Sequence, residues 1–234
     1  MNSTIVISAA GRGSRLGKGI PKSLVYVGDR RILEWQLTVM CRPDDCVHLV
    51  VGYMGDEVAR LANSLHPNIR IFYNRDWEST KTAASLSLGA APVLDRCVSL
   101  DGDLLVHPED FRSLIECDQD MIGITPVISA EPVHANVDSQ GICHALDYEP
   151  KTEWEWTGLV NFHPDRIPPG SNHVFEMIQC MLPSKTFVVR SIEIDTMEDL
   201  LFAPFAWDAI RTNTPTEALP HGQGQDRSVL ASAD

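Results

Sequence analysis

Short apolar runs and segments with helical spacing alternate along the first 120 residues. Runs of four or five apolar residues between polar or turn-forming residues are typical of buried strands, and apolar residues three or four apart are typical of amphipathic helices. Their alternation predicts βαβ units and a mostly parallel sheet. We expect Thr82 to be the N-cap of its helix. The predicted strands cover residues 4–8, 47–51, 69–73 and 97–100, and the predicted helices cover residues 31–40, 55–64, 82–91 and 108–115.

The pattern changes after about residue 120. We expect an antiparallel extension of the sheet here rather than a second domain, so that residues 1–211 form one domain. From Thr212 onward the chain is polar and rich in Pro and Gly, and residues 212–234 are expected to be a disordered tail. The predicted strands of the extension cover residues 121–127, 141–146, 158–162 and 187–194, and one helix covers residues 173–181.

The charge balance excludes one class of partner. The 234 residues contain 19 Lys and Arg against 32 Asp and Glu, a net charge of −13. The broad basic surface that binds nucleic acid or an anionic membrane is therefore missing. A small anion can still bind in a locally basic pocket, because residues 1–28 contain four cations and no acid.

The six cysteines are scattered along the chain without metal-binding or disulfide-framework spacing. Neither an export signal nor an apolar run of the ~18 residues needed to cross a membrane is found. The sequence therefore predicts a cytoplasmic protein with free thiols.

A glycine-containing loop follows the first predicted strand. Small residues let the backbone approach a phosphate, so that several N–H groups can surround the anion, and the cations can meet its charge. The spacing matches neither the Walker loop nor the dinucleotide fingerprint, whose third glycine would fall at Leu16. The alternative is an ordinary turn with surface cations. The loop residues are Ala9, Ala10, Gly11, Arg12, Gly13, Ser14 and Arg15, followed by Pro21 and Lys22.

Carboxylates follow two apolar segments. Asp101 and Asp103 flank a glycine at the end of a predicted strand, and Asp195 also follows an apolar strand. Carboxylates at the ligand edge of an open α/β sheet suit Mg²⁺ bridged to phosphates. The alternatives are a turn that uses Asp and Gly for their backbone tolerance, and a helix N-cap at Asp195.

Together the loop, the Pro21–Lys22 pair and the aspartates resemble the nucleotidyltransferases of the GT-A-like fold, over about residues 3–205. The resemblance implies an α/β, Rossmann-like fold with a mixed, mostly parallel sheet flanked by helices and an antiparallel acceptor-binding extension. Asn74-x-x-Trp77 followed by Ser85-Leu86 looks most like the phosphocholine and phosphonate cytidylyltransferase branch. In that branch this segment lies near the nucleotide, which implies nucleotide-binding roles for Asn74 and Ser85.

The reaction implied by the resemblance is nucleotidyl transfer. An oxygen of a phosphorylated or phosphonate acceptor attacks the α-phosphorus of a nucleoside triphosphate, CTP being favoured, and pyrophosphate leaves. Arg15 and the loop amides would hold the terminal phosphates, and Lys22 would stabilise charge at the α-phosphate. Asp103 and Asp195 would hold Mg²⁺, with Asp101 as a ligand or an orienting neighbour.

The acceptor region is expected in residues 149–158. Trp154 and Trp156 alternate with acids, so on a strand both indoles share one face. An aromatic wall near carboxylates suits an alkylammonium group, as in phosphocholine or aminoethylphosphonate, and the alternative is a packing surface. Resemblance to the family implies that Thr157 and Gly158 also face the acceptor.

Other functions remain open from sequence. A sugar-1-phosphate nucleotidyltransferase would share the loop, the lysine and the aspartates, and a catalytically silent nucleotide-binding domain would share the fold. A glycosyltransferase of similar fold could contain Asp-x-Asp but would not need the glycine loop. A homodimer is possible.

Overall fold

A computed structural model describes residues 3–213. Its central sheet has nine strands in the order β5-β4-β1-β6-β11-β8-β12-β10-β9. The strands of this sheet are β1 (Thr4–Ala9), β4 (Val47–Val51), β5 (Ile69–Tyr73), β6 (Cys97–Asp101), β8 (Met121–Pro126), β9 (His134–Val137), β10 (Ile142–Asp147), β11 (Trp154–Phe162) and β12 (Ser184–Val188).

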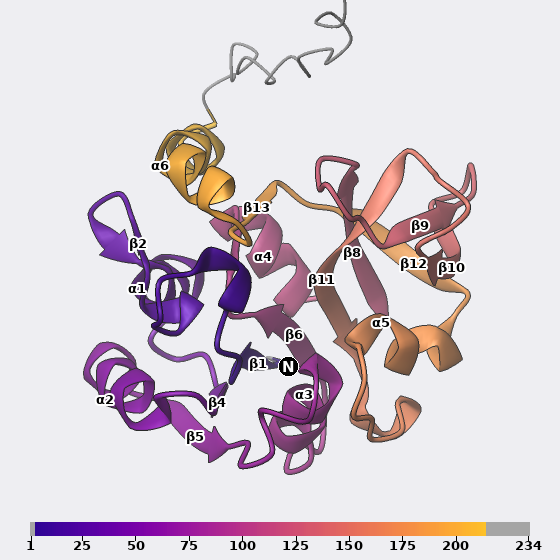
Figure 1. The fold of residues 1–234 in the computed structure, drawn as a ribbon. Coiled ribbons are helices and arrows are strands. Elements are labelled where there is room, and N and C mark those ends of the chain that lie inside the picture. The colour runs from indigo at the N-terminus through magenta and orange to yellow at the C-terminus, as the bar shows by residue number, and fades with distance from the viewer. Residues whose placement is uncertain (1–2, 214–234) are drawn as a thin grey trace, which may run out of the picture.

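The first half of the chain builds the parallel part of the sheet. β5, β4, β1 and β6 are parallel neighbours, and β11 joins β6 in the antiparallel direction. The extension is antiparallel except for the parallel pair β8–β12. Figure 1 shows these two halves side by side, with β13 (Ser191–Glu193) between them. The α/β fold with a mostly parallel sheet is therefore confirmed.

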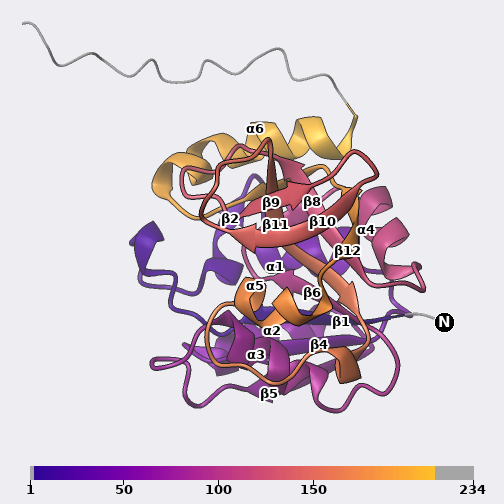
Figure 2. The same cartoon turned by 90° about the vertical axis from the view of Figure 1, so that its right-hand side faces the viewer.

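Helices cover both faces of the sheet, which explains why the parallel strands are apolar throughout. Ile5 and Ile7 belong to a core shared with α1, α2, α4 and α6, whereas Val6 and Val50 pack with α3 and α5. In Figure 2, α6 crosses the top of the molecule. The helices are α1 (Ile32–Trp35), α2 (Gly55–Leu65), α3 (Thr82–Ala90), α4 (Pro108–Ile115), α5 (Val174–Met177) and α6 (Met197–Arg211).

Several elements differ from the predicted ones. The helix expected at residues 31–40 changes to π geometry at Gln36–Met40, and the strand expected at residues 187–194 is divided between β12 and β13. β11 begins four residues before the strand predicted at 158–162. The strand β9 and the hairpin of β2 (Tyr26–Val27) and β3 (Arg30–Arg31) were not predicted.

The expected N-cap at Thr82 is wrong. Lys81 occupies the N-cap position of α3 and makes no capping bond with its side chain. The amide of Ala83 in the first turn donates instead to the carbonyl of Asn172, 3.0 Å away. A neighbouring segment therefore supplies the acceptor that a capping side chain would otherwise supply.

The described part of the chain ends just after α6. Most of the expected tail, residues 214–234, lies outside the described residues. Among residues 3–213, no helix combines the length and apolar character needed to cross a membrane.

Candidate active site

The site lies where β1 and β6 end. These parallel strands pair Ser8 with Asp101, so the glycine loop and the Asp101–Asp103 turn leave the sheet at the same edge. A second small sheet adds Asp195 to this edge. β7 (Leu104–Val106) pairs with β13, and the amide of Ile194 donates to the carbonyl of Asp103 at 3.1 Å.

The glycine loop is shaped around Lys22. Gly13 has a φ of +64°, a conformation that favours glycine. A Cβ at Gly13 would lie 2.5 Å from Cγ of Lys22, so the glycine also leaves room for the lysine chain. Ala9 and Ala10 are buried, whereas Gly11, Arg12, Ser14 and Arg15 are exposed. The exposed part of the loop is therefore available to a ligand.

The predicted cations contact the predicted metal ligands. Nζ of Lys22 lies 2.7 Å from Oδ2 of Asp103 and also bonds to Oδ1 of Asp195. The guanidinium of Arg15 lies 2.8 Å from Oδ2 of Asp195. Burial alone would lower the pKa of Lys22, but Asp103 and Asp195 outweigh it and the pKa is raised. Lys22 therefore remains charged.

Three carboxylates form a group that could hold a metal ion. Ligand oxygens of Asp103, Glu193 and Asp195 lie within 4.8 Å of one another. Hard oxygen donors of this kind fit Mg²⁺. Although Glu193 as a residue is exposed, its carboxyl is partly shielded from water beside the other acids, and this shielding and then the charges of Asp103, Asp195 and Asp101 raise its pKa above the usual range.

The sequence prediction missed Glu193. The signal was present, because Glu193 precedes Asp195 by two residues and side chains two apart share a face of extended chain. Asp101, predicted as a possible ligand, is not in the group of three. The alternative of an N-cap at Asp195 is wrong, since Thr196 caps α6 by accepting from the amide of Asp199.

Asp101 lies behind the metal-binding group. Its Oδ1 is buried and has no hydrogen-bond partner among residues 3–213. Burial, and next the charge of Asp103, raise the pKa of Asp101 to about 8. Gly158 lies against this carboxylate, since a Cβ there would be 2.6 Å from Oδ2. The predicted acceptor segment therefore reaches the site at Gly158.

Asn74 and Ser85 are brought together but are not presented to a ligand. Nδ2 of Asn74 donates to Oγ of Ser85 at 3.3 Å and to Oγ1 of Thr80 at 3.1 Å, and its Oδ1 accepts from the amide of Asp76. Asn74 and Ser85 are both buried. In this conformation they fix the turn after β5.

The two tryptophans pack into the protein. Trp154 and Trp156 are partly buried against the core that contains Val6 and Val50, and Nε1 of Trp156 donates to the carbonyl of Leu159. The hydroxyl of Thr157 donates to the carbonyl of Gly123. The structure therefore favours the packing alternative over an exposed aromatic wall.

Similar folds occur in solved structures. The CTP:phosphocholine cytidylyltransferase LicC of Streptococcus pneumoniae matches with a TM-score of 0.75 and 16% identity, over 88% of this chain and 100% of that one. The inositol-1-phosphate CTP transferase of T. maritima matches with a TM-score of 0.69 and 18% identity, over 85% of this chain and 91% of that one. A UDP-glucose pyrophosphorylase matches with a TM-score of 0.66 and 14% identity, over 90% and 100%. At these identities the likeness shows the fold.

Sequence relatives match over about half of the chain. The bifunctional protein GlmU of Legionella pneumophila is 28% identical over 123 residues, which is 51% of this chain. The GlmU of Alkalilimnicola ehrlichii is 30% identical over 131 residues. The aligned parts cover only 26% and 28% of these relatives.

The family of MobA-like NTP transferase domains matches residues 5–140, which include the glycine loop, Lys22 and Asp103. This match covers more than half of the chain and agrees with the fold and with the arrangement of cations and carboxylates. The chain therefore contains an NTP transferase domain and belongs to the MobA-like NTP transferase family.

Proposed function

We propose that the protein is a Mg²⁺-dependent cytidylyltransferase. It would join CMP from CTP to a small phosphorylated or phosphonate acceptor and release pyrophosphate. The observation that carries the proposal is the convergence of Lys22 and Arg15 on Asp103 and Asp195. Cations suited to a triphosphate thus lie directly beside carboxylates suited to a divalent metal.

The chain's own residues provide positioning and charge, which dominate in phosphoryl-group chemistry. Loop amides and Arg15 would hold the terminal phosphates of the nucleotide. Lys22 would stabilise the negative charge that develops at the α-phosphate when the acceptor oxygen attacks and the bond to pyrophosphate breaks. The acceptor is already an anion, so no general base is required.

The metal would be held by Asp103, Glu193 and Asp195, whose oxygens lie within 4.8 Å of one another. Mg²⁺ at this position supplies charge neutralisation for the triphosphate. Without a ligand, Lys22 and Arg15 pair with the two aspartates of this group, Asp103 and Asp195. On nucleotide binding, their partners would change from carboxylate to phosphate oxygens.

Cytidine as the base is supported by similarity rather than by a visible contact. Two structural neighbours are CTP-dependent by name, one acting on phosphocholine and one on inositol 1-phosphate. We include Asn74 and Ser85 in the nucleotide site as residues that shape the turn after β5. Thr157 and Gly158 would lie on the acceptor side, next to Asp101.

A sugar-1-phosphate nucleotidyltransferase is the second candidate. The exposed tryptophan wall was the feature that favoured an alkylammonium acceptor, and the structure packs both indoles against the core. UDP-glucose pyrophosphorylase is among the structural neighbours. A catalytically silent domain is less well supported, because the loop cations and the acidic group are all in place.

Three further expectations remain part of the proposal. We propose one catalytic domain spanning residues 1–211, a cytoplasmic location, and partners limited to small molecules, without nucleic acid or membrane. Homodimer formation is compatible with them.

A pyrophosphate-release assay tests the function. CTP, UTP, GTP and ATP are each combined with phosphocholine, aminoethylphosphonate, hydroxyethylphosphonate and sugar 1-phosphates in the presence of Mg²⁺. We expect release with CTP and at least one phosphonate or phosphorylated alcohol. Pyrophosphate release only with sugar 1-phosphates would select the second candidate. If no combination released pyrophosphate, both candidate functions would be overturned.

A further inference from the structure

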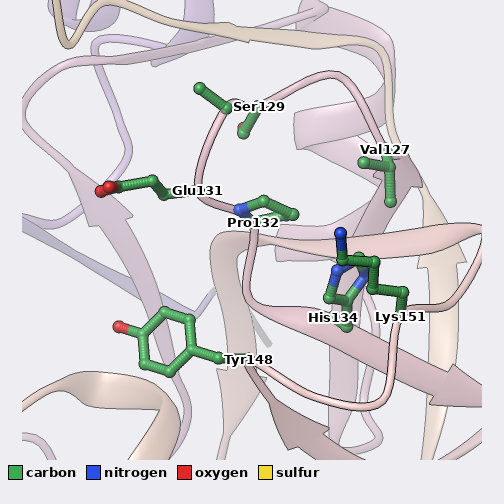
Figure 3. A pocket seen from close by; sticks show the side chains of 8 residues that line it. Val127, Ser129, Glu131, Pro132, His134, Tyr148 and Lys151 are labelled. Atoms are coloured by element: carbon green, nitrogen blue, oxygen red, sulfur yellow. The ribbon is translucent and has the colours of Figure 1, made fainter.

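A pocket lies at the end of the extension, away from the glycine loop. Two connections form it, residues 127–133 between β8 and β9 and residues 148–153 between β10 and β11. Its volume is about 600 Å³. Figure 3 shows the side chains that line it: Val127, Ser129, Ala130, Glu131, Pro132, His134, Tyr148 and Lys151.

Hydrogen bonds hold both connections in place. The buried carboxylate of Glu155 accepts from the amide of Ser129 at 3.2 Å and from its hydroxyl at 3.0 Å. On the other side, the hydroxyl of Thr152 donates to the carbonyl of Ala135 at 2.9 Å. The ring of Tyr148 packs edge-on against Phe175. These contacts fix the two connections, so the pocket is preformed.

A buried histidine supplies the first free donor. His134 is only 6% exposed, and its Nδ1 accepts from the amide of Thr152 at 3.2 Å. The proton of the neutral ring is therefore on Nε2. Among residues 3–213, no acceptor bonds to this Nε2, although the histidine lines the pocket. The nitrogen itself is accessible from the pocket, so it can donate to a ligand there.

Lys151 supplies the second free donor. It lines the same pocket and forms no ion pair with any of the described residues. In Figure 3 its amine and the ring of His134 lie on one side of the pocket, whereas the carboxylate of Glu131 and the hydroxyl of Tyr148 lie on the other. The pocket thus has a donor side and an acceptor side.

We propose that this pocket binds a small molecule by an anionic group, a carboxylate or a phosphate, held between His134 and Lys151. A charge-assisted bond from Lys151 and a second from Nε2 of His134 would satisfy both free donors. Glu131 on the opposite wall disfavours a second anionic group, so the other end of the ligand is neutral or cationic.

The bound anion is not the reacting phosphate or phosphonate. Gly123 lies beside Thr157, next to the glycine that contacts Asp101. His134 pairs with Glu155, which precedes Gly158 by three residues, a distance of about 10 Å in an extended strand. A two-carbon phosphonate cannot span it. Two sources of the anion remain, the far end of a longer acceptor and a separate small molecule.

Nuclear magnetic resonance of the histidine rings tests the site, with inorganic phosphate and acetate as probes. His134→Asn identifies the His134 signal. We expect that signal to shift saturably with at least one probe, and the apparent Kd to rise at least tenfold in Lys151→Met. The control Lys185→Met removes an exposed lysine that bonds to Gln119 instead, and it should bind the probe normally. If the His134 signal did not shift with either probe, or if it shifted in Lys151→Met as it does in the parent protein, the inference would be overturned.

A competition experiment identifies the source. An acceptor that is active in pyrophosphate release is added to the probe-bound protein. Displacement of the probe supports the far end of the acceptor, and simultaneous binding supports a separate ligand. Only the choice between these two sources of the anion rests on the proposed function. The His134 signal needs no turnover, so failure of nucleotidyl transfer and failure of this site are separately visible.

Discussion

The ammonium of Lys22 lies 2.7 Å from the carboxylate of Asp103, although 81 positions separate the two residues in the chain. The contact joins the glycine loop after β1 to the turn after β6. Gly13 makes it possible, because any Cβ at that position would collide with the lysine chain. The loop and the acidic turn are therefore one unit in space.

Lys22→Ala should reduce turnover at least 100-fold, the order of loss seen when one group that stabilises transition-state charge is removed. The rate of pyrophosphate release measures it, and circular dichroism checks the fold. Lys18→Ala is the matched control, because Lys18 is an exposed cation of the same loop without an ion pair among the described residues. Activity within threefold of the parent would remove Lys22 from the mechanism.

Glu193→Gln should raise the Mg²⁺ concentration needed for half-maximal activity by about tenfold or more, a loss typical of a weakened metal site. The reason is that glutamine cannot become the anionic oxygen ligand that Glu193 would provide when a metal displaces its proton. A Mg²⁺ titration of activity measures the change. Glu198→Gln, at an exposed position in the first turn of α6, should leave it unaltered. An unaltered titration for Glu193→Gln as well would restrict the metal ligands to the aspartates.

The sequence was informative about the parallel half of the fold. All five residues of β4 are buried, and a strand buried on both faces leaves a continuous apolar run that is easily recognised. β9 was missed for the opposite reason. It has four residues, of which only His134 and Ala135 are buried, so it leaves no continuous apolar run.

The site residues likewise divide into those that a sequence pattern indicates and those that only the folded arrangement reveals. The loop and Asp103 could be placed together because parallel strands end at one edge. Glu193 could have been linked to Asp195 by their spacing of two residues, but its approach to Asp103 depends on the pairing of β13 with β7, which the sequence does not indicate. For Trp154 and Trp156, alternation showed that they share a face but could not show that the core covers that face.

Gly158→Ala should reduce kcat/KM at least tenfold, because the new methyl group would lie 2.6 Å from Oδ2 of Asp101 and displace it. Gly158 also has a φ of +85°, so the variant carries a backbone penalty of order 1 kcal/mol. Gly141→Ala separates the two effects, since its φ is +74° but the nearest atom is 3.7 Å away. Equal loss of activity in both variants would show that backbone strain alone is responsible.

Tyr53→Phe should loosen the glycine loop. The amide of Tyr53 donates to the carbonyl of Ala10 at 2.9 Å, and its hydroxyl donates to the carbonyl of Gly19 at 3.0 Å, so one residue holds both ends of the loop. Loss of a bond of about 1 kcal/mol predicts roughly fivefold faster trypsin cleavage after Arg12, Arg15 or Lys18, and a higher KM for the nucleotide.

Tyr73→Phe is the control for that experiment. It also removes an exposed hydroxyl bond, to Asp56 at 2.9 Å, but at the end of β5 rather than at the loop. Cleavage of the loop should proceed at the parental rate in this variant. If trypsin cleaved the loop equally faster in Tyr53→Phe and Tyr73→Phe, the loop would not depend on the hydroxyl of Tyr53.

Asp45→Asn should destabilise the protein at neutral pH by about 3 kcal/mol, because the carboxylate forms a buried pair with Arg112, with bonds of 2.9 and 2.6 Å. Burial alone would raise the pKa of Asp45, but the bonds from Arg112 and the amide of Arg42 outweigh it and the pKa is lowered. An acid whose folded pKa is lowered stabilises the fold above its unfolded pKa, and this contribution disappears as the pH falls through the folded value. Urea unfolding at several pH values should therefore show the parent and the variant converging below about pH 4. A constant difference down to pH 2 would show that the pair does not titrate in this way.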